Sequence, residues 1–319
     1  MKRIIKSVTI LIGLLVFSKN QPFIYDICVM RKWDSTTKKY SYVIGLGDFH
    51  CKRNNRVNYL QIKQLNGIIS ACPRDKTKII VEDVSSPNYR GKYGCGRYFV
   101  NSRGGILGGL TDVCKRKGFK SCQNIEYRFC RVVTLAPILN SLRYSSMFGS
   151  SSPLIKMSYL QSEIIEQMRH IRTYNDGKLL NVWYKQCINN VIKHMKLLNL
   201  DAHLYKNVKN YIDLQATATD RLRFVKKLLT FDSSLIDIEI VHAIVNASSW
   251  PSKLVIAGGS HIKSMRNILQ KIGYETIYKT NVKINREYST KKGPGFNISP
   301  GGFCYRPKPV DLTVLKRFL

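Results

Sequence analysis

The fold is decided by a short stretch near the end of the chain, residues 253–261, which reads KLVIAGGSH. Its first five residues form the apolar run expected of a buried strand, and two glycines follow that run. Apolar residues then recur at helical spacing up to Lys271, and Gly273 stands where a helix-ending glycine is expected. The stretch therefore predicts a strand, a connection that carries His261, and a helix, which together form the repeating unit of α/β proteins.

The same local pattern occurs about two hundred residues earlier in the chain. Residues 40–46 are rich in β-forming side chains and end in Gly47-Asp48-Phe49-His50, and a helix is predicted at 58–70. Residues 77–81 predict a buried strand that ends at Glu82, and further strands are expected at 124–129 and 274–278. The alternation predicts an α/β fold with a largely parallel or mixed central sheet, flanked by helices and interrupted by a helical insertion.

The segments of the chain differ in composition and periodicity. Residues 1–18 place basic residues before an apolar run, as a secretory signal peptide does, so we expect an exported protein, periplasmic or secreted. A buried first strand or helix is the alternative interpretation of this segment. We expect residues 19–150 to form the first half of the α/β domain, with a glycine-rich loop, and residues 151–250 to form a helical insertion. Residues 251–280 are expected to form the second half of the domain, and residues 281–319 a basic tail broken by prolines.

The composition describes a folded protein with a strongly cationic surface. The 319 residues carry 52 Lys and Arg against 20 Asp and Glu, a net charge of +32, while 44% hydrophobic residues exclude a disordered basic tail. No run has the length of a membrane span. The charge has two explanations: an ordinary solvated surface encoded by an AT-rich genome, or attraction to a polyanion or an anionic membrane surface. No specific nucleic-acid-binding motif is present.

The nine cysteines contain no Cys-X-X-Cys pair, which argues against a zinc ribbon or a thioredoxin-type site. In an exported protein, some of the five between Cys72 and Cys130 could form disulfides. The sequence does not give their connectivity. The odd count leaves at least one thiol free or paired between molecules.

Three candidate ligands follow predicted strands, namely His50, Glu82 and His261. In an open α/β sheet, ligands bind beyond the carboxyl ends of the strands, so these side chains are expected to converge there. Two imidazoles and a carboxylate suit a divalent metal such as zinc or manganese, with an open position for water. Asp48 is a candidate further ligand, partner of a ligand, or general base. The alternatives are structural histidines and, for residues 258–260, an anion cradle at a helix N-terminus.

These motifs resemble the TIKI/TraB, ChaN-like and erythromycin-esterase superfamily, whose members pair two Gly-X-X-His motifs with a strand-end glutamate. Residues 255–274 look like the last family motif, residues 47–50 like the first, and residues 80–82 like the glutamate motif. The resemblance is confined to these three separate segments of the chain. Many family members have Glu or Thr at the position of Asp48.

The resemblance implies a metal-dependent catalytic centre formed by His50, Glu82 and His261. It also implies a hydrolase that cleaves a peptide or ester bond. Arg128, with Glu126, resembles a downstream strand from which an arginine often faces the substrate, although an ordinary surface charge is the alternative for Arg128. Two rival functions stay open: a non-catalytic, ChaN-like protein that binds haem or another ligand, and a cationic effector that adheres to anionic surfaces.

Overall fold

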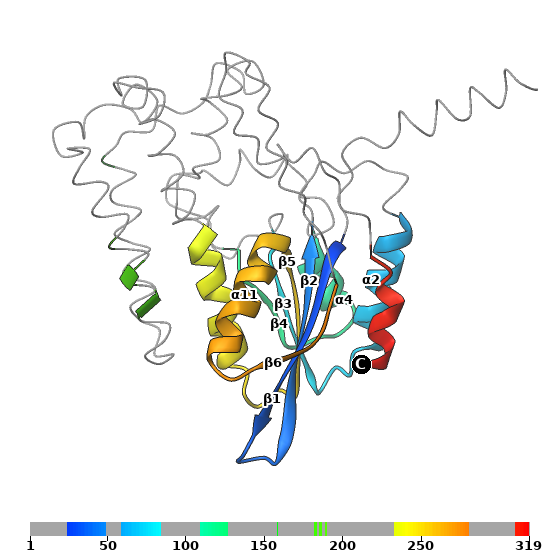
Figure 1. The fold of residues 1–319 in the computed structure, drawn as a ribbon. Coiled ribbons are helices and arrows are strands. Elements are labelled where there is room, and N and C mark those ends of the chain that lie inside the picture. The colour runs from blue at the N-terminus through cyan, green and yellow to red at the C-terminus, as the bar shows by residue number, and fades with distance from the viewer. Residues whose placement is uncertain are drawn as a thin grey trace, which may run out of the picture.

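A computed structural model describes residues 24–48, 59–83, 109–126, 233–280 and 310–318, with a few isolated helical residues between 158 and 189. These ranges form a six-stranded sheet of order β4-β3-β5-β2-β1-β6, with helices on both sides (Figure 1). The strands are β1 (Ile24–Asp34), β2 (Lys39–Asp48), β3 (Thr77–Val81), β4 (Cys122–Asn124), β5 (Ser252–Gly258) and β6 (Glu275–Lys279). The helices are α2 (Tyr59–Ala71), α4 (Leu110–Arg116), α11 (Gly259–Lys271) and the 3-10 helix η2 (Leu312–Arg317).

The sheet is mixed, and its parallel part holds the predicted strands β2, β3 and β5, whereas the strand predicted at 274–278 is β6, which pairs with β1. Strands β4, β3, β5 and β2 run parallel to one another, while β1 pairs antiparallel with both β2 and β6. Strand β5 lies between β3 and β2, so a strand from the end of the chain completes the sheet begun by the first half. The predicted α/β class is therefore confirmed, in its mixed form.

Two apolar cores lie on opposite faces of the sheet because successive side chains of a strand point to opposite sides. In β5, Leu254 and Ile256 pack against α2, α4 and η2, whereas Val255 and Ala257 pack against α11 and the helical residues 233–245. This arrangement is a three-layer sandwich, in which each face of the sheet has its own helical cover. No helix among the described residues is both long enough and apolar enough to span a membrane.

The predicted elements at 40–46, 58–70, 77–81, 253–257, 261–271 and 274–278 all occur, with boundaries within two residues. The strand predicted at 124–129 is wrong in its position, because β4 ends at Asn124. Strand β1 and helix α4 were not predicted. Strand β1 escapes a simple pattern because its first part is buried on both faces and its last residues are exposed.

Candidate functional site

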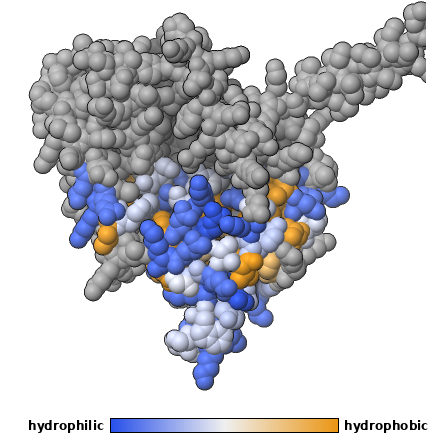
Figure 2. Space-filling view, in the orientation of Figure 1, coloured by the Kyte–Doolittle hydropathy of each residue, from blue (hydrophilic) through white to orange (hydrophobic). Residues whose placement is uncertain are grey.

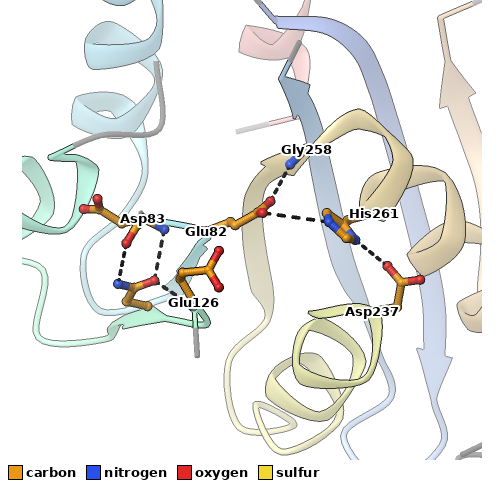
Figure 3. Close-up of polar contacts among 7 residues, drawn as sticks. Glu82, Asp83, Glu126, Asp237, Gly258 and His261 are labelled. Carbon is orange, nitrogen blue, oxygen red and sulfur yellow. Dashed lines mark hydrogen bonds and ion pairs between the residues drawn. The ribbon is translucent and has the colours of Figure 1, made fainter. Parts of the chain in front are cut away.

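The carboxyl ends of three neighbouring parallel strands bring polar residues together at one edge of the sheet. Glu82 follows β3, Asp48 ends β2, and His261 lies in the first turn of α11, directly after β5. All three side chains are buried. The expected convergence of Glu82 and His261 is thus seen in the structure (Figure 3).

Glu82 is held in place by the strand and helix beside it. Its side chain is fully buried, and its backbone N–H donates to the carbonyl of Ile256 at 2.9 Å. The carboxylate atom Oε2 accepts a hydrogen bond of 2.7 Å from the N–H of Gly258, which caps α11. The negative charge therefore lies at the positive end of the helix dipole, where it is stabilised.

His261 is oriented by a carboxylate on the opposite side from Glu82. Its Nδ1 lies 2.7 Å from Oδ1 of Asp237, which belongs to the helical residues 233–245. Since an ionised carboxylate only accepts, Nδ1 carries the proton and donates it. The other ring nitrogen, Nε2, lies 3.8 Å from Oε1 of Glu82. Asp237 thereby directs the Nε2 position toward Glu82 (Figure 3).

The glycines of the two motifs are required by close packing. A Cβ on Gly259 would lie 2.0 Å from the hydroxyl of Tyr25, and one on Gly47 would lie 2.9 Å from the Cα of Gly259. Neither Gly47 nor Gly259 has a positive φ, and Gly258 has φ −56°. No left-handed turn therefore requires these glycines; Gly47 and Gly259 instead let α11 approach β2 and Tyr25.

A second buried network supports the edge beside Glu82. The Asp83 carboxylate accepts from the N–H groups of Gly109 and Thr111 at 3.1 and 2.9 Å, so it caps helix α4. Asn124 and the Asp83 backbone exchange two hydrogen bonds of 3.0 Å. The N–H of Glu126 donates to Asn124 Oδ1 at 2.9 Å. The fully buried Glu126 is thus fixed at the end of β4, next to the strand that carries Glu82.

Asp48 lies on the far side of β5 from Glu82. It is the register partner of Gly258, the residue whose N–H binds Glu82. The Asp48 charge also acts on Tyr25, whose pKa is raised to about 12 by burial, by Asp26 and by Asp48, in that order of size. Tyr25 therefore keeps its proton across the physiological pH range.

Two predicted site residues, His50 and Arg128, lie outside the described residues. Within the described ranges, no three His, Cys, Asp or Glu side chains form a group able to hold a metal ion. Asp237 was missed by the sequence analysis. Its signal is an acidic residue between Ile236 and Ile238 in a buried, mostly apolar helix, although Glu239 of the same helix gives the same signal.

Comparisons with family models, with curated proteins and with solved structures give no match to this chain. The class of protein is therefore defined by the fold and the site alone: an α/β protein with a buried carboxylate–imidazole–carboxylate row at the carboxyl edge of its parallel strands.

Proposed function

We propose that the protein is an exported metal-dependent hydrolase of the TIKI/erythromycin-esterase type, which cleaves a peptide or ester bond. The observation that carries the proposal is the row Glu82–His261–Asp237. In metal sites, a ligating histidine almost always donates its second ring N–H to a carboxylate, a backbone carbonyl or a water, and Asp237 is such an acceptor for His261.

The pair Glu82 and His261 fits a zinc or manganese ion. Two ligand atoms that each lie ~2.1 Å from one ion stand at most roughly 4.2 Å apart. The 3.8 Å between Nε2 and Oε1 meets this limit and is too long for a direct hydrogen bond. Glu82 and His261 would hold the ion with His50 as the third ligand, and Asp48 lies on the adjacent strand.

A bound divalent ion would supply Lewis-acid activation of water and of the scissile carbonyl group. The chain's own residues set the conditions for that chemistry. Asp237 fixes the His261 tautomer, and the Gly258 N–H fixes the Glu82 carboxylate. Burial at the sheet edge lowers the local dielectric and strengthens these interactions. Glu126 and Arg128 are the proposed substrate-binding residues.

The proposal is tested by hydrolysis assays on the full chain with a panel of fluorogenic peptides and aryl esters. Activity should require added zinc or manganese, vanish with a chelator, and be lost in His261→Ala. The matched control is His242→Ala, a histidine of the same helical segment as Asp237 that lies outside the row. Activity that persists in His261→Ala, or that ignores the chelator, would contradict the proposal.

The rival haem-binding function makes a separate spectroscopic prediction. A Soret band in the purified protein, or on titration with haem, would favour it over the hydrolase. Export is tested by N-terminal sequencing of the protein made with its own first residues. A start near residue 19 supports the proposal, and an intact Met1 on cytoplasmic material contradicts it.

A second candidate function, adhesion to an anionic membrane surface, is favoured by the β1–β2 hairpin. Figure 2 shows the end of this hairpin projecting beyond the other described residues. Trp33 and Tyr40 are 51% and 39% exposed there, and Arg31 lies over the Tyr40 ring at 4.7 Å. Exposed aromatic rings beside cations suit the headgroup region of a bilayer.

Vesicle sedimentation tests this adhesion. Vesicles that contain phosphatidylglycerol should retain the protein, pure phosphatidylcholine should not, and retention should fall with salt. The double variant Trp33→Ala, Tyr40→Ala should release it from the anionic vesicles. Equal retention of the variant and the wild type would exclude the hairpin as the contact.

A further inference from the structure

Helix α4 and strand β4 carry two cysteines that the fold places side by side. Helix α4 ends in a Schellman motif: Gly118 has φ 78°, its N–H donates to Lys115 O at 2.9 Å, and the N–H of Phe119 donates to Cys114 O at 3.1 Å. This reversal returns the chain to β4, which begins at Cys122. Cys114 is therefore brought against Cys122, eight positions later in the chain.

The two cysteines lie at the core that covers one face of the sheet, where α4 packs against β4. Cys114 is fully buried in that core, Cys122 packs against the core half-buried, and the two side chains interact with each other. Cys72, at the end of α2, belongs to the same core. All three are free thiols in this structure, as is Cys28 on the opposite face of the sheet.

We propose that Cys114 and Cys122 form an intramolecular disulfide when the protein meets a disulfide oxidant, such as oxidised glutathione or a thiol oxidase. This site goes beyond the proposed hydrolase and does not depend on it. The linkage would tie α4 to β4. Both elements also belong to the Asp83–Asn124 network beside Glu82.

The contact also sets the order of the reaction. The interaction between the two side chains lowers the pKa of Cys122 and raises the pKa of Cys114, and the burial of Cys114 raises its pKa further. Cys122 is thus the thiol that more readily becomes a thiolate, and it is the more exposed of the two.

The Cys122 thiolate attacks one sulfur of the oxidant's disulfide, and the other sulfur leaves as a thiolate. Cys114 then loses its proton and attacks Cys122 Sγ, which releases the second glutathione thiolate. Two electrons pass from the protein thiols to the oxidant, and the two protons they lose are taken up by the two released thiolates. One S–S bond is broken in the oxidant and one is formed in the protein.

Peptide mapping under non-reducing conditions tests the proposal directly. The full chain is equilibrated in glutathione redox buffers, alkylated, and digested with trypsin. Lys115 and Lys120 separate the two cysteines onto the peptides 104–115 and 121–128, each with no other cysteine. The expected product is these two peptides joined, two hydrogens lighter than their sum.

Matched variants keep the result interpretable. Cys28→Ser should leave the linkage intact, whereas Cys122→Ser and Cys122→Ala should leave Cys114 to be alkylated after unfolding. Oxidation should raise the Tm of the wild type and of Cys28→Ser by a few degrees, on the order of 2–6 °C, and leave the Cys122 variants unchanged. Two alkylated peptides from the oxidised wild type, or a linkage from Cys72 to either cysteine instead, would overturn the proposal.

Discussion

The two edges of the parallel strands hold buried charge in opposite ways. At the carboxyl edge, Glu82, Asp83 and His261 each meet a hydrogen-bond partner placed for them by a neighbouring strand or helix. At the amino edge, the side chain of Lys253 is 1% exposed, and its Nζ donates to the neutral hydroxyl of Ser41. Burial lowers the pKa of Lys253 to about 8.

The two edges differ in whether their buried charges are compensated. At Lys253 the cost of burying the charge outweighs the attraction of Asp34, so this buried charge lowers stability. Paired and oriented charges at the other edge are the arrangement expected of a binding or catalytic site. The following changes test the contrast between the edges.

The largest effect on folding is expected at the carboxyl edge, from Asp83→Ala. The change leaves two N–H groups of the α4 start without their acceptor, so the free energy of unfolding should fall by about 3 kcal/mol. Asp83→Asn keeps one acceptor oxygen and should lose less. Urea denaturation measures both, and a loss for Asp83→Ala below ~0.5 kcal/mol would show that Asp83 does not hold this edge together.

Asp237→Ala should weaken metal binding by about 10–100-fold, because an outer carboxylate orients the ligating histidine. Isothermal titration calorimetry with zinc measures the change. His242→Ala in the same helical segment serves as the control and should bind zinc as the wild type does. Unchanged affinity in Asp237→Ala would remove Asp237 from the site.

At the amino edge, Lys253→Met should instead stabilise the protein, by about 1–2 kcal/mol at pH 7, because it removes a buried charge. The folded-state pKa of Lys253 lies near 8, below the ordinary value of 10.5, so the unfolded chain binds more protons between these values. Wild-type stability therefore rises over this pH window, and the advantage of the variant shrinks.

Denaturation at pH 7 and pH 10 measures this convergence. The exposed Lys263 on α11 provides the control, since Lys263→Met should change stability by less than about 0.5 kcal/mol at both pH values. A destabilised Lys253→Met would mean that its hydrogen bond to Ser41 outweighs the cost of burying the charge.

The smallest effect is expected at the exposed hairpin. Trp33 and Tyr40 are cross-strand partners whose rings meet edge to face at 5.0 Å. A double-mutant cycle with Trp33→Ala and Tyr40→Ala should give a coupling energy of about 0.5–1 kcal/mol. A coupling energy of zero would show that the contact between the two rings does not stabilise the hairpin. Their exposure would then have to be explained by a binding partner.

The sequence predicted the elements whose evidence is local. The apolar run before Gly258 and the helical spacing after His261 specify β5 and α11 without reference to other residues. The sequence also predicted that Glu82 and His261 lie at the same edge of the sheet. Each directly follows a strand, and neighbouring parallel strands align their carboxyl ends.

Residues whose role depends on distant segments could not be predicted in the same way. Asp237 looks like an ordinary helix acid until the fold places it against His261, 24 positions later. Gly259 looks like a turn residue until the Tyr25 ring packs over it. The pairing of β1 with β6 likewise joins segments some 250 residues apart, as Cys28 and Lys279 show.

Zinc and manganese titrations of the wild type beside Glu82→Gln and His261→Ala show whether Glu82 and His261 hold a metal ion. Glutamine keeps an oxygen for the Gly258 N–H, so the fold should persist by circular dichroism while one ligand is lost. One metal ion should bind per wild-type chain, and both variants should bind it more weakly by more than roughly 100-fold. Wild-type protein that binds neither metal, or variants that bind as tightly as the wild type, would contradict this expectation.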